Sequence, residues 1–195
     1  MKIIATFIAL AFIGCNGDHK DHSDSVETKI DSASQTKNTT STNPPATATA
    51  AFPTKQILAA YLQLKNALAV DNSKDAAIAA NAIVSVLPTD SASGLSGQQL
   101  KVYSDLYGDM KENAEHIGTN ADKIAHQREH FIMLSKDIED FVKAFGNAGQ
   151  TLYKDFCPMA NEGKGAIWIS ETEEIKNPYF GKEMQECGKV KETFK

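Results

Sequence analysis

From Phe52 onward, apolar residues recur at intervals of three and four positions, the period of a helix with one buried face. Three interruptions divide this pattern: Asp71-Asn72, the segment 88–95 that begins with a proline, and 118–120. Proline cannot continue a helix, and short polar breaks join helices that lie side by side. We therefore expect helices over about 54–70, 73–87, 97–117 and 121–145, packed as an antiparallel four-helix bundle.

Beyond Gly149 the helical period disappears. Two short runs that are typical of strands, 151–153 and 166–169, flank a turn-rich segment at 161–165. A turn at 177–181 precedes a single helical turn through Met184 and Cys187. The predicted fold class is mainly α: a four-helix bundle with a small C-terminal β-hairpin-like appendage, together forming one domain over residues 52–195.

The first residues have the pattern of an export signal. Lys2 precedes an apolar run, 3–13, which is shorter than the roughly 20 residues that a bilayer span needs. Gly14-Cys15 follows and resembles the lipobox of bacterial lipoproteins. We expect 1–14 to be a lipoprotein signal peptide and Cys15 to be the lipidated anchor of a protein at the periplasmic face of the cell envelope. A plain signal peptide with an incidental cysteine is the alternative, and both predict export.

Residues 15–51 are dominated by small polar residues and cannot bury enough apolar surface to fold, which predicts a disordered linker behind the lipidated cysteine. His19 and His22 lie here among three aspartates. A solvated polar tether accounts for them, and we place no site there.

Composition and motifs exclude several function classes. The chain has 20 Lys and Arg against 25 Asp and Glu, a net charge of -5, so there is no electrostatic basis for binding nucleic acid. Three cysteines in 195 residues are too few for a disulfide scaffold. The sequence contains no thioredoxin-like cysteine pair, glycine-rich phosphate loop, Gly-x-Ser-x-Gly or His-Glu-x-x-His. We therefore predict that the protein is not an enzyme.

Sulfur ligands concentrate in the appendage. Cys157 and Met159 are two positions apart, and Met184 and Cys187 are three apart, spacings at which two side chains can converge on one ion. Thiolates and thioethers are the soft ligands that select Cu(I). Two such pairs in one short segment predict a site for Cu(I), or for Ag(I).

The predicted fourth helix offers further ligands. His126, His130 and Met133 share one stripe at the flank of its apolar face, where the appendage could pack, and we expect His130 to join the sulfur ligands. His116 should lie near them across the short loop. His116, His126 and Met133 are secondary candidates, with solvent-facing or capping roles as the alternative for the two histidines. Trp168 is expected in the hairpin core, although an indole face beside Cu(I) would give a cation–π contact.

Two other chemistries fit the cysteines. A Cys157–Cys187 disulfide would close a loop of about 30 residues and stabilise the fold by about 3–4 kcal/mol. Zinc could bind the same cysteines together with His126 and His130, but the neighbouring methionines favour copper. The disulfide supports an alternative function, a non-metal domain that docks a partner protein in the cell envelope.

Several segments resemble a known family. They are 122–131, with Leu134-Ser135, and then 156–160, 163–170 and 175–184, with Cys187-Gly188. Together they are similar to a bacterial family of uncharacterised periplasmic domains that also occurs fused to adaptor subunits of CusB-like copper and silver efflux pumps. The resemblance implies copper handling outside the cytoplasm and a heavy-metal efflux system or a copper-acceptor protein as partner. The family's motif positions fall on His130, Cys157, Met159, Trp168, Met184 and Cys187.

The adaptor's long hairpin and barrel segments are not found in this chain. We therefore expect a free-standing lipoprotein that buffers or delivers Cu(I), and that is not itself a pump subunit.

Overall fold

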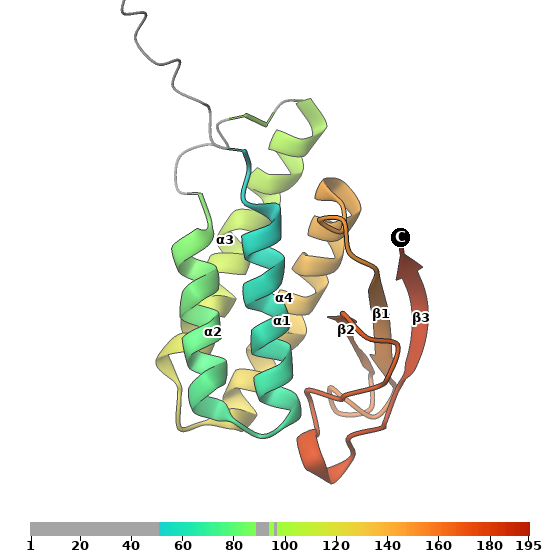
Figure 1. Ribbon diagram of the computed structural model, residues 1–195. Helices are drawn as coiled ribbons and strands as arrows, with labels where there is room; N and C mark the ends of the chain where they lie inside the picture. The colour runs from blue at the N-terminus through green and yellow to red at the C-terminus, as the bar shows by residue number, and fades with distance from the viewer. Residues whose placement is uncertain (1–50, 89–93, 96) are drawn as a thin grey trace, which may run out of the picture. The chain divides into compact units, whose positions relative to one another are not determined.

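The computed structural model describes residues 51–88, 94–95 and 97–195, which form four helices followed by a small sheet (Figure 1). The helices are α1 (Thr54–Ala69), α2 (Ser73–Val86), α3 (Gly97–Thr119) and α4 (Ile124–Phe145). The strands are β1 (Leu152–Cys157), β2 (Ala166–Ser170) and β3 (Lys189–Phe194), with a 3-10 turn, η1 (Gly181–Glu183), before β3. The predicted signal peptide, Cys15 and the linker up to residue 50 lie outside the described residues. Within the described ranges, no helix is long and apolar enough to cross a membrane.

The helices form the predicted antiparallel bundle, in which each helix packs against the next one along the chain. Asp71 reverses the chain after α1 with a φ of 60°, and the side chain of Asn72 then caps α2 by accepting the backbone N–H of Asp75 at 3.1 Å. At the far end, Gly146 terminates α4 with a φ of 83°, a conformation that favours glycine. Local sequence signals thus set the bounds of the bundle.

The appendage is a three-stranded antiparallel sheet in the order β2-β1-β3, so the predicted hairpin is its first two strands. In the hairpin, Asp155 pairs with Trp168 and Cys157 with Ala166. The third strand, Lys-Val-Lys-Glu-Thr-Phe, has no buried residue, which explains why hydrophobic patterning did not predict it. It joins the sheet through backbone pairing with β1, with a register shift between Lys154 and Asp155.

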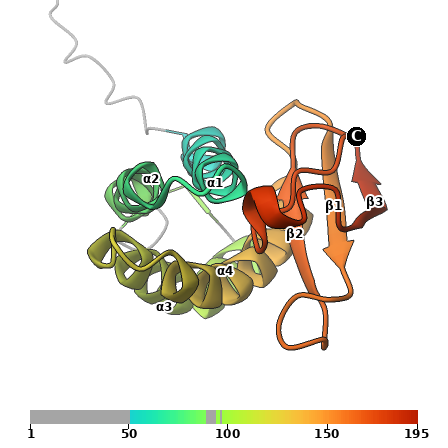
Figure 2. The same cartoon turned by 90° about the horizontal axis from the view of Figure 1, so that it is seen from below.

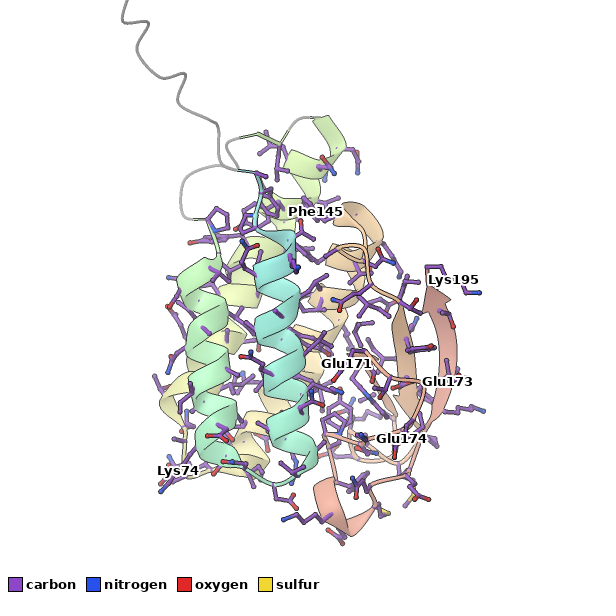
Figure 3. All side chains as sticks on the ribbon, viewed as in Figure 1. Lys74, Phe145, Glu171, Glu173, Glu174 and Lys195 are labelled. Atoms are coloured by element: carbon purple, nitrogen blue, oxygen red, sulfur yellow. The ribbon has the colours of Figure 1, made fainter. Side chains whose placement is uncertain are left out.

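The sheet lies beside α1 and α4, while α2 and α3 form the other side of the bundle (Figure 2). Side chains fill the space between bundle and sheet, with Glu171 at the boundary (Figure 3). Apolar residues of both parts form one continuous core. In it the ring of Tyr61 on α1 stacks on Phe131 of α4 at 5.4 Å, and Trp168 of β2 packs edge-on against Tyr179 at 5.9 Å. Bundle and sheet are therefore one packing unit.

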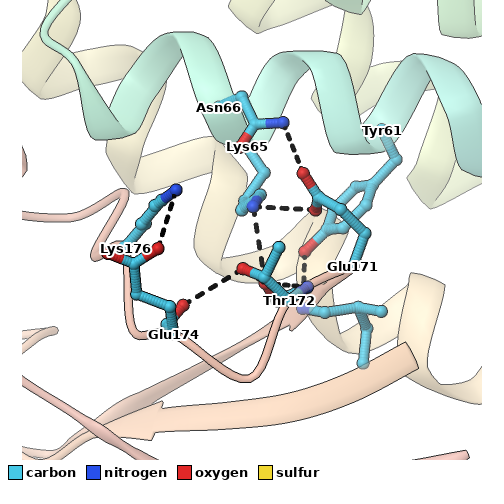
Figure 4. A network of polar contacts seen from close by, with 9 residues as sticks. Tyr61, Lys65, Asn66, Glu171, Thr172, Glu174 and Lys176 are labelled. Atoms are coloured by element: carbon cyan, nitrogen blue, oxygen red, sulfur yellow. Dashed lines mark hydrogen bonds and ion pairs between the residues drawn. The ribbon is translucent and has the colours of Figure 1, made fainter. Parts of the chain in front are cut away.

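Polar contacts fix the sheet against α1 (Figure 4). The ammonium of Lys65 is fully buried and lies 2.9 Å from the carboxylate of Glu171, which also accepts a 2.7 Å hydrogen bond from Asn66. The backbone N–H of Ile169 donates to the hydroxyl of Tyr61 at 3.1 Å. Because a buried charge without a partner is costly, this ion pair ties the end of β2 to one position along α1.

Candidate functional site

Cys157 and Cys187 are the two cysteines within the described residues, and both are unpaired thiols whose sulfur atoms lie 2.7 Å apart. Cys157 is fully buried at the end of β1, and Cys187 is half-buried just before β3. Thirty positions of sequence separate them. The fold has therefore brought together the two sulfurs that were predicted to act together.

Sheet register explains this meeting. Phe156 pairs with Lys189 across β1 and β3, so the chain just before β3 passes the end of β1. Gly188 makes the approach possible: its φ is 152°, and a Cβ atom there would lie 2.8 Å from the ring of Trp168 and 3.3 Å from the carbonyl oxygen of Phe156. Trp168 is fully buried against this glycine, which confirms its expected place in the core and also puts it next to the cysteine segment.

Asn177 organises the loop that carries Cys187, and sequence reasoning did not single it out. Its buried side-chain amide donates to the carbonyl oxygen of Cys187 at 2.6 Å, and its side-chain oxygen accepts the backbone N–H of Tyr179 at 2.8 Å. Its backbone N–H donates to Gln185 at 2.8 Å. One buried polar residue thus holds both sides of the loop. Its place in Asn-Pro-Tyr-Phe-Gly is the only sequence signal that pointed to it.

The two methionines contact the cysteine pair through their backbones. The N–H of Cys187 donates to the carbonyl oxygen of Met184 at 3.1 Å, and the N–H of Met159 donates toward the Cys187 sulfur. The Met159 side chain is 55% exposed and lines a groove of about 610 Å³ between α4 and the β1–β2 loop, with Ile132 and Phe180 on its walls. Both thioethers are therefore carried by segments that adjoin the thiols.

The environment of the thiols disfavours a lone thiolate. The hydrogen bond with Cys157 raises the pKa of Cys187, burial raises it further, and the Met159 N–H opposes both. Two residues before Cys157, the carboxylate of Asp155 is buried without a hydrogen-bond partner among the described residues. Burial raises the pKa of Asp155 to about 7, the positive charge of Lys65 lowers it, and the negative charge of Glu171 raises it. The site thus favours protonated groups over free anions.

The three predicted histidine candidates meet at the end of the bundle. His116 lies in the last turn of α3, and His126 and His130 lie in the first two turns of α4. One ring nitrogen of each can be chosen so that all three lie within 4.8 Å of one another. Burial, and then the nearby His116 and His126, lower the pKa of His130. The expected approach of His116 to the start of the fourth helix is confirmed.

The described residues contain no other group of three histidine, cysteine or acidic ligand atoms that meets this limit. The structure therefore groups His130 with His116 and His126, and not with the two thiols. Met133 lies on the same helix with its side chain 51% exposed. The candidate ligands form two groups, one of sulfur and one of imidazole.

Arg128 lies on α4 between two of these histidines and was not predicted to have a role. Its guanidinium donates to the carbonyl oxygen of Pro178 at 2.8 Å, to that of Leu68 at 3.0 Å and to the carboxylate of Asp71 at 2.6 Å. Asp71 also accepts the backbone N–H of Lys182 at 3.1 Å. One side chain thus joins α4, the end of α1 and the loop that leads to Cys187.

The fold and these two groups define a mainly α domain with a β appendage and two candidate metal-ligating clusters. Comparison with protein families adds that residues 57–150, which cover α1 from Ile57 onward and all of α2, α3 and α4, match the family described as "Protein of unknown function (DUF3347)". No curated protein and no solved structure matches the chain.

Proposed function

We propose that this protein is an exported, membrane-anchored lipoprotein that binds Cu(I), or Ag(I), for buffering, delivery or efflux. The observation that carries the proposal is the 2.7 Å distance between the Cys157 and Cys187 sulfurs, which are thirty positions apart in the sequence. Two thiols that lie side by side offer a pair of soft donors for a monovalent ion once the sulfurs move apart far enough to admit it. The methionine-bearing segments beside them supply two further soft donors, Met159 and Met184.

The proposal depends on the redox state of the cysteines. Binding requires that the thiols lose their protons, so affinity should weaken as the pH falls. Oxidation of the pair to a disulfide removes two electrons and two protons and leaves no thiolate to bind the ion. The compartment matters for this reason: an exported protein meets oxidising conditions, and a bound ion would protect the pair.

We further propose that the resemblance to periplasmic domains fused with CusB-like efflux adaptors reflects a shared task. A lipid on Cys15 would keep the domain at the membrane, where a heavy-metal efflux system or a copper-acceptor protein could receive the ion. Mass spectrometry of the mature N-terminus tests this part: acyl chains on Cys15 support it, and an unmodified Cys15 contradicts it.

A second candidate function uses the same observation. Oxidation of the adjacent thiols would close the loop between Cys157 and Cys187, which Asn177 already holds in place. The domain would then be a disulfide-stabilised interaction module of the envelope without a metal. A quantitative Cys157–Cys187 bond in protein isolated from metal-replete cells, measured by non-reducing mass analysis, favours this function over copper binding.

The direct test is an anaerobic Cu(I) titration of the reduced full chain against a high-affinity chromogenic chelator. The wild type should withdraw one Cu(I) per chain, and Cys157→Ser with Cys187→Ser should abolish this competition. Met133→Leu is the matched control, because it removes an exposed thioether outside the sulfur group. Unchanged competition in the double variant would refute the assignment, and copper-edge absorption spectra would show whether sulfur surrounds the ion.

A further inference from the structure

We infer that His116, His126 and His130 form a second metal site, independent of the cysteines, for a divalent late first-row ion such as Zn²⁺ or Cu²⁺. The three rings come from two consecutive helices and meet at one end of the bundle. Neither thiol belongs to this group of ligand atoms. The inference does not depend on Cu(I) binding by the appendage.

The three rings lie close together, which supports a common centre, but they have to turn before they can share one ion. The rings of His116 and His130 stack in parallel with centroids 4.3 Å apart and an interplanar angle of 7°, while His126 stands nearly perpendicular to His130 at 4.7 Å. Because the lone pair of an imidazole nitrogen lies in the plane of its ring, rotation about the terminal side-chain torsion, which is broad for histidine, has to redirect the stacked rings. In a tetrahedral complex with Zn–N bonds of about 2.1 Å, two ligand nitrogens lie about 3.4 Å apart. Nitrogens within 4.8 Å therefore need to close by at most about 1.4 Å, which the same side-chain rotations can supply.

Hydrogen bonds at Nδ1 orient two of the rings. The Nδ1 of His130 lies 3.0 Å from the side-chain oxygen of Asn113, and the Nδ1 of His126 lies 3.2 Å from the carboxylate of Glu129. A proton on each Nδ1 satisfies these acceptors and leaves the Nε2 lone pair free. Metal-bound histidines commonly use this arrangement, in which a carbonyl or carboxylate accepts from the nitrogen that does not bind the ion.

The donor set selects the class of ion. Neutral imidazole suits Zn²⁺, Cu²⁺ and Ni²⁺, and for a given nitrogen site Cu²⁺ binds most tightly among the divalent first-row ions. Three protein ligands leave at least one coordination position for water or for a ligand from another molecule. His116 is exposed and the other two rings are half-buried, so an ion here could exchange with solvent or with a partner.

Cobalt(II) titration of the reduced full chain is a suitable test, because its visible bands report coordination and thiolate ligands add charge-transfer bands that imidazole lacks. We expect visible bands without a thiolate contribution, and Zn²⁺ should displace them. His116→Gln with His126→Gln and His130→Gln should remove the bands. His19→Gln with His22→Gln is the matched control and should keep them, as should Cys157→Ser with Cys187→Ser.

Several outcomes would overturn the inference: no bands, bands that survive the triple histidine variant, or bands lost with the cysteines. In the first case the three rings only pack against one another. Asn113→Asp gives a check that misfolding cannot imitate, since a carboxylate on Nδ1 makes the imidazole a better donor, and Co²⁺ should bind about tenfold more tightly. Failure of this site leaves the Cu(I) titration unaffected, so the two proposals fail separately.

Discussion

The sulfur group and the imidazole group are built in opposite ways. His116, His126 and His130 follow one another within fifteen residues, and helical spacing across one short loop is enough to gather them. Cys157 and Cys187 meet because β3 pairs with β1, because Asn177 holds the loop between them, and because Gly188 permits the close approach of the chain. The difference teaches that the imidazole group depends on local structure, whereas the sulfur group depends on the whole appendage. Substitutions in the appendage should therefore separate the two.

The largest effect is expected at Gly188. In Gly188→Ala the new Cβ would meet Trp168 and the Phe156 carbonyl oxygen, in a backbone conformation that disfavours any side chain. Overpacking and the positive φ together should lower the free energy of unfolding by about 2–4 kcal/mol. Chemical denaturation measures this. Gly108→Ala on α3, where a Cβ meets nothing, is the control and should not destabilise the protein. Equal stability of both variants would contradict the tight approach at Gly188.

Asp155 should give the next largest effect, one that depends on pH. Its pKa is about 7 in the folded protein against an ordinary value of 3.8, so between these values the folded state keeps a proton that the unfolded chain has lost. Stability should then fall as the pH rises from about 4 to about 7, by about 2 kcal/mol after allowance for relaxation of the site. Asp155→Asn should flatten this profile.

Thermal unfolding of both proteins across this pH range measures the difference. Asp122→Asn, at an exposed position, is the control for the loss of a carboxylate and should keep the wild-type profile. If Asp155→Asn also keeps the wild-type dependence of stability on pH, then Asp155 is ionised in the folded protein throughout this pH range.

Arg128→Gln should have a smaller effect that reaches both groups. The substitution removes three hydrogen bonds that join α4 to α1 and to the Pro178 loop, and should cost about 1–2 kcal/mol. The hydrogen bond with Arg128 lowers the pKa of Asp71. The Arg128–Asp71 ion pair therefore stabilises the folded state fully at pH values above the ordinary pKa of 3.8, and this stabilisation is lost as the pH falls further. The stability gap between the variant and the wild type should therefore narrow in acid.

Hydrogen exchange at the 177–188 loop gives a second readout for Arg128→Gln, because the guanidinium holds Pro178 directly. Faster exchange there, with the centre of α3 unchanged, is the expected pattern. Uniform acceleration throughout the domain would indicate general destabilisation and not the loss of a specific tether.

The sequence was sufficient to predict the bundle, and it supplied the candidate ligands without showing how they are grouped. Helical period, Pro88 and Gly146 marked the helices, and soft-ligand spacing identified Cys157 and Cys187. The polar third strand had no hydrophobic signal. His130 was assigned to the sulfur ligands because the flank it occupies could face either neighbour, and only the packing of α3 against α4 places it beside Asn113. Arg128 and Asn177 were missed since their main partners are backbone groups, which leave no trace in a sequence pattern.

The match to the family ends at residue 150, shortly after α4, but the bundle also depends on contacts with residues beyond that point. Lys65 finds its counter-charge on Glu171, and the Tyr61 hydroxyl takes its backbone donor from Ile169. A chain truncated after residue 150 would leave the Lys65 ammonium without its carboxylate and expose an apolar face of α1 and α4 to water. The segment that matches the family is thus shorter than the segment that packs as one core. A protein shortened to residue 150 is expected to aggregate.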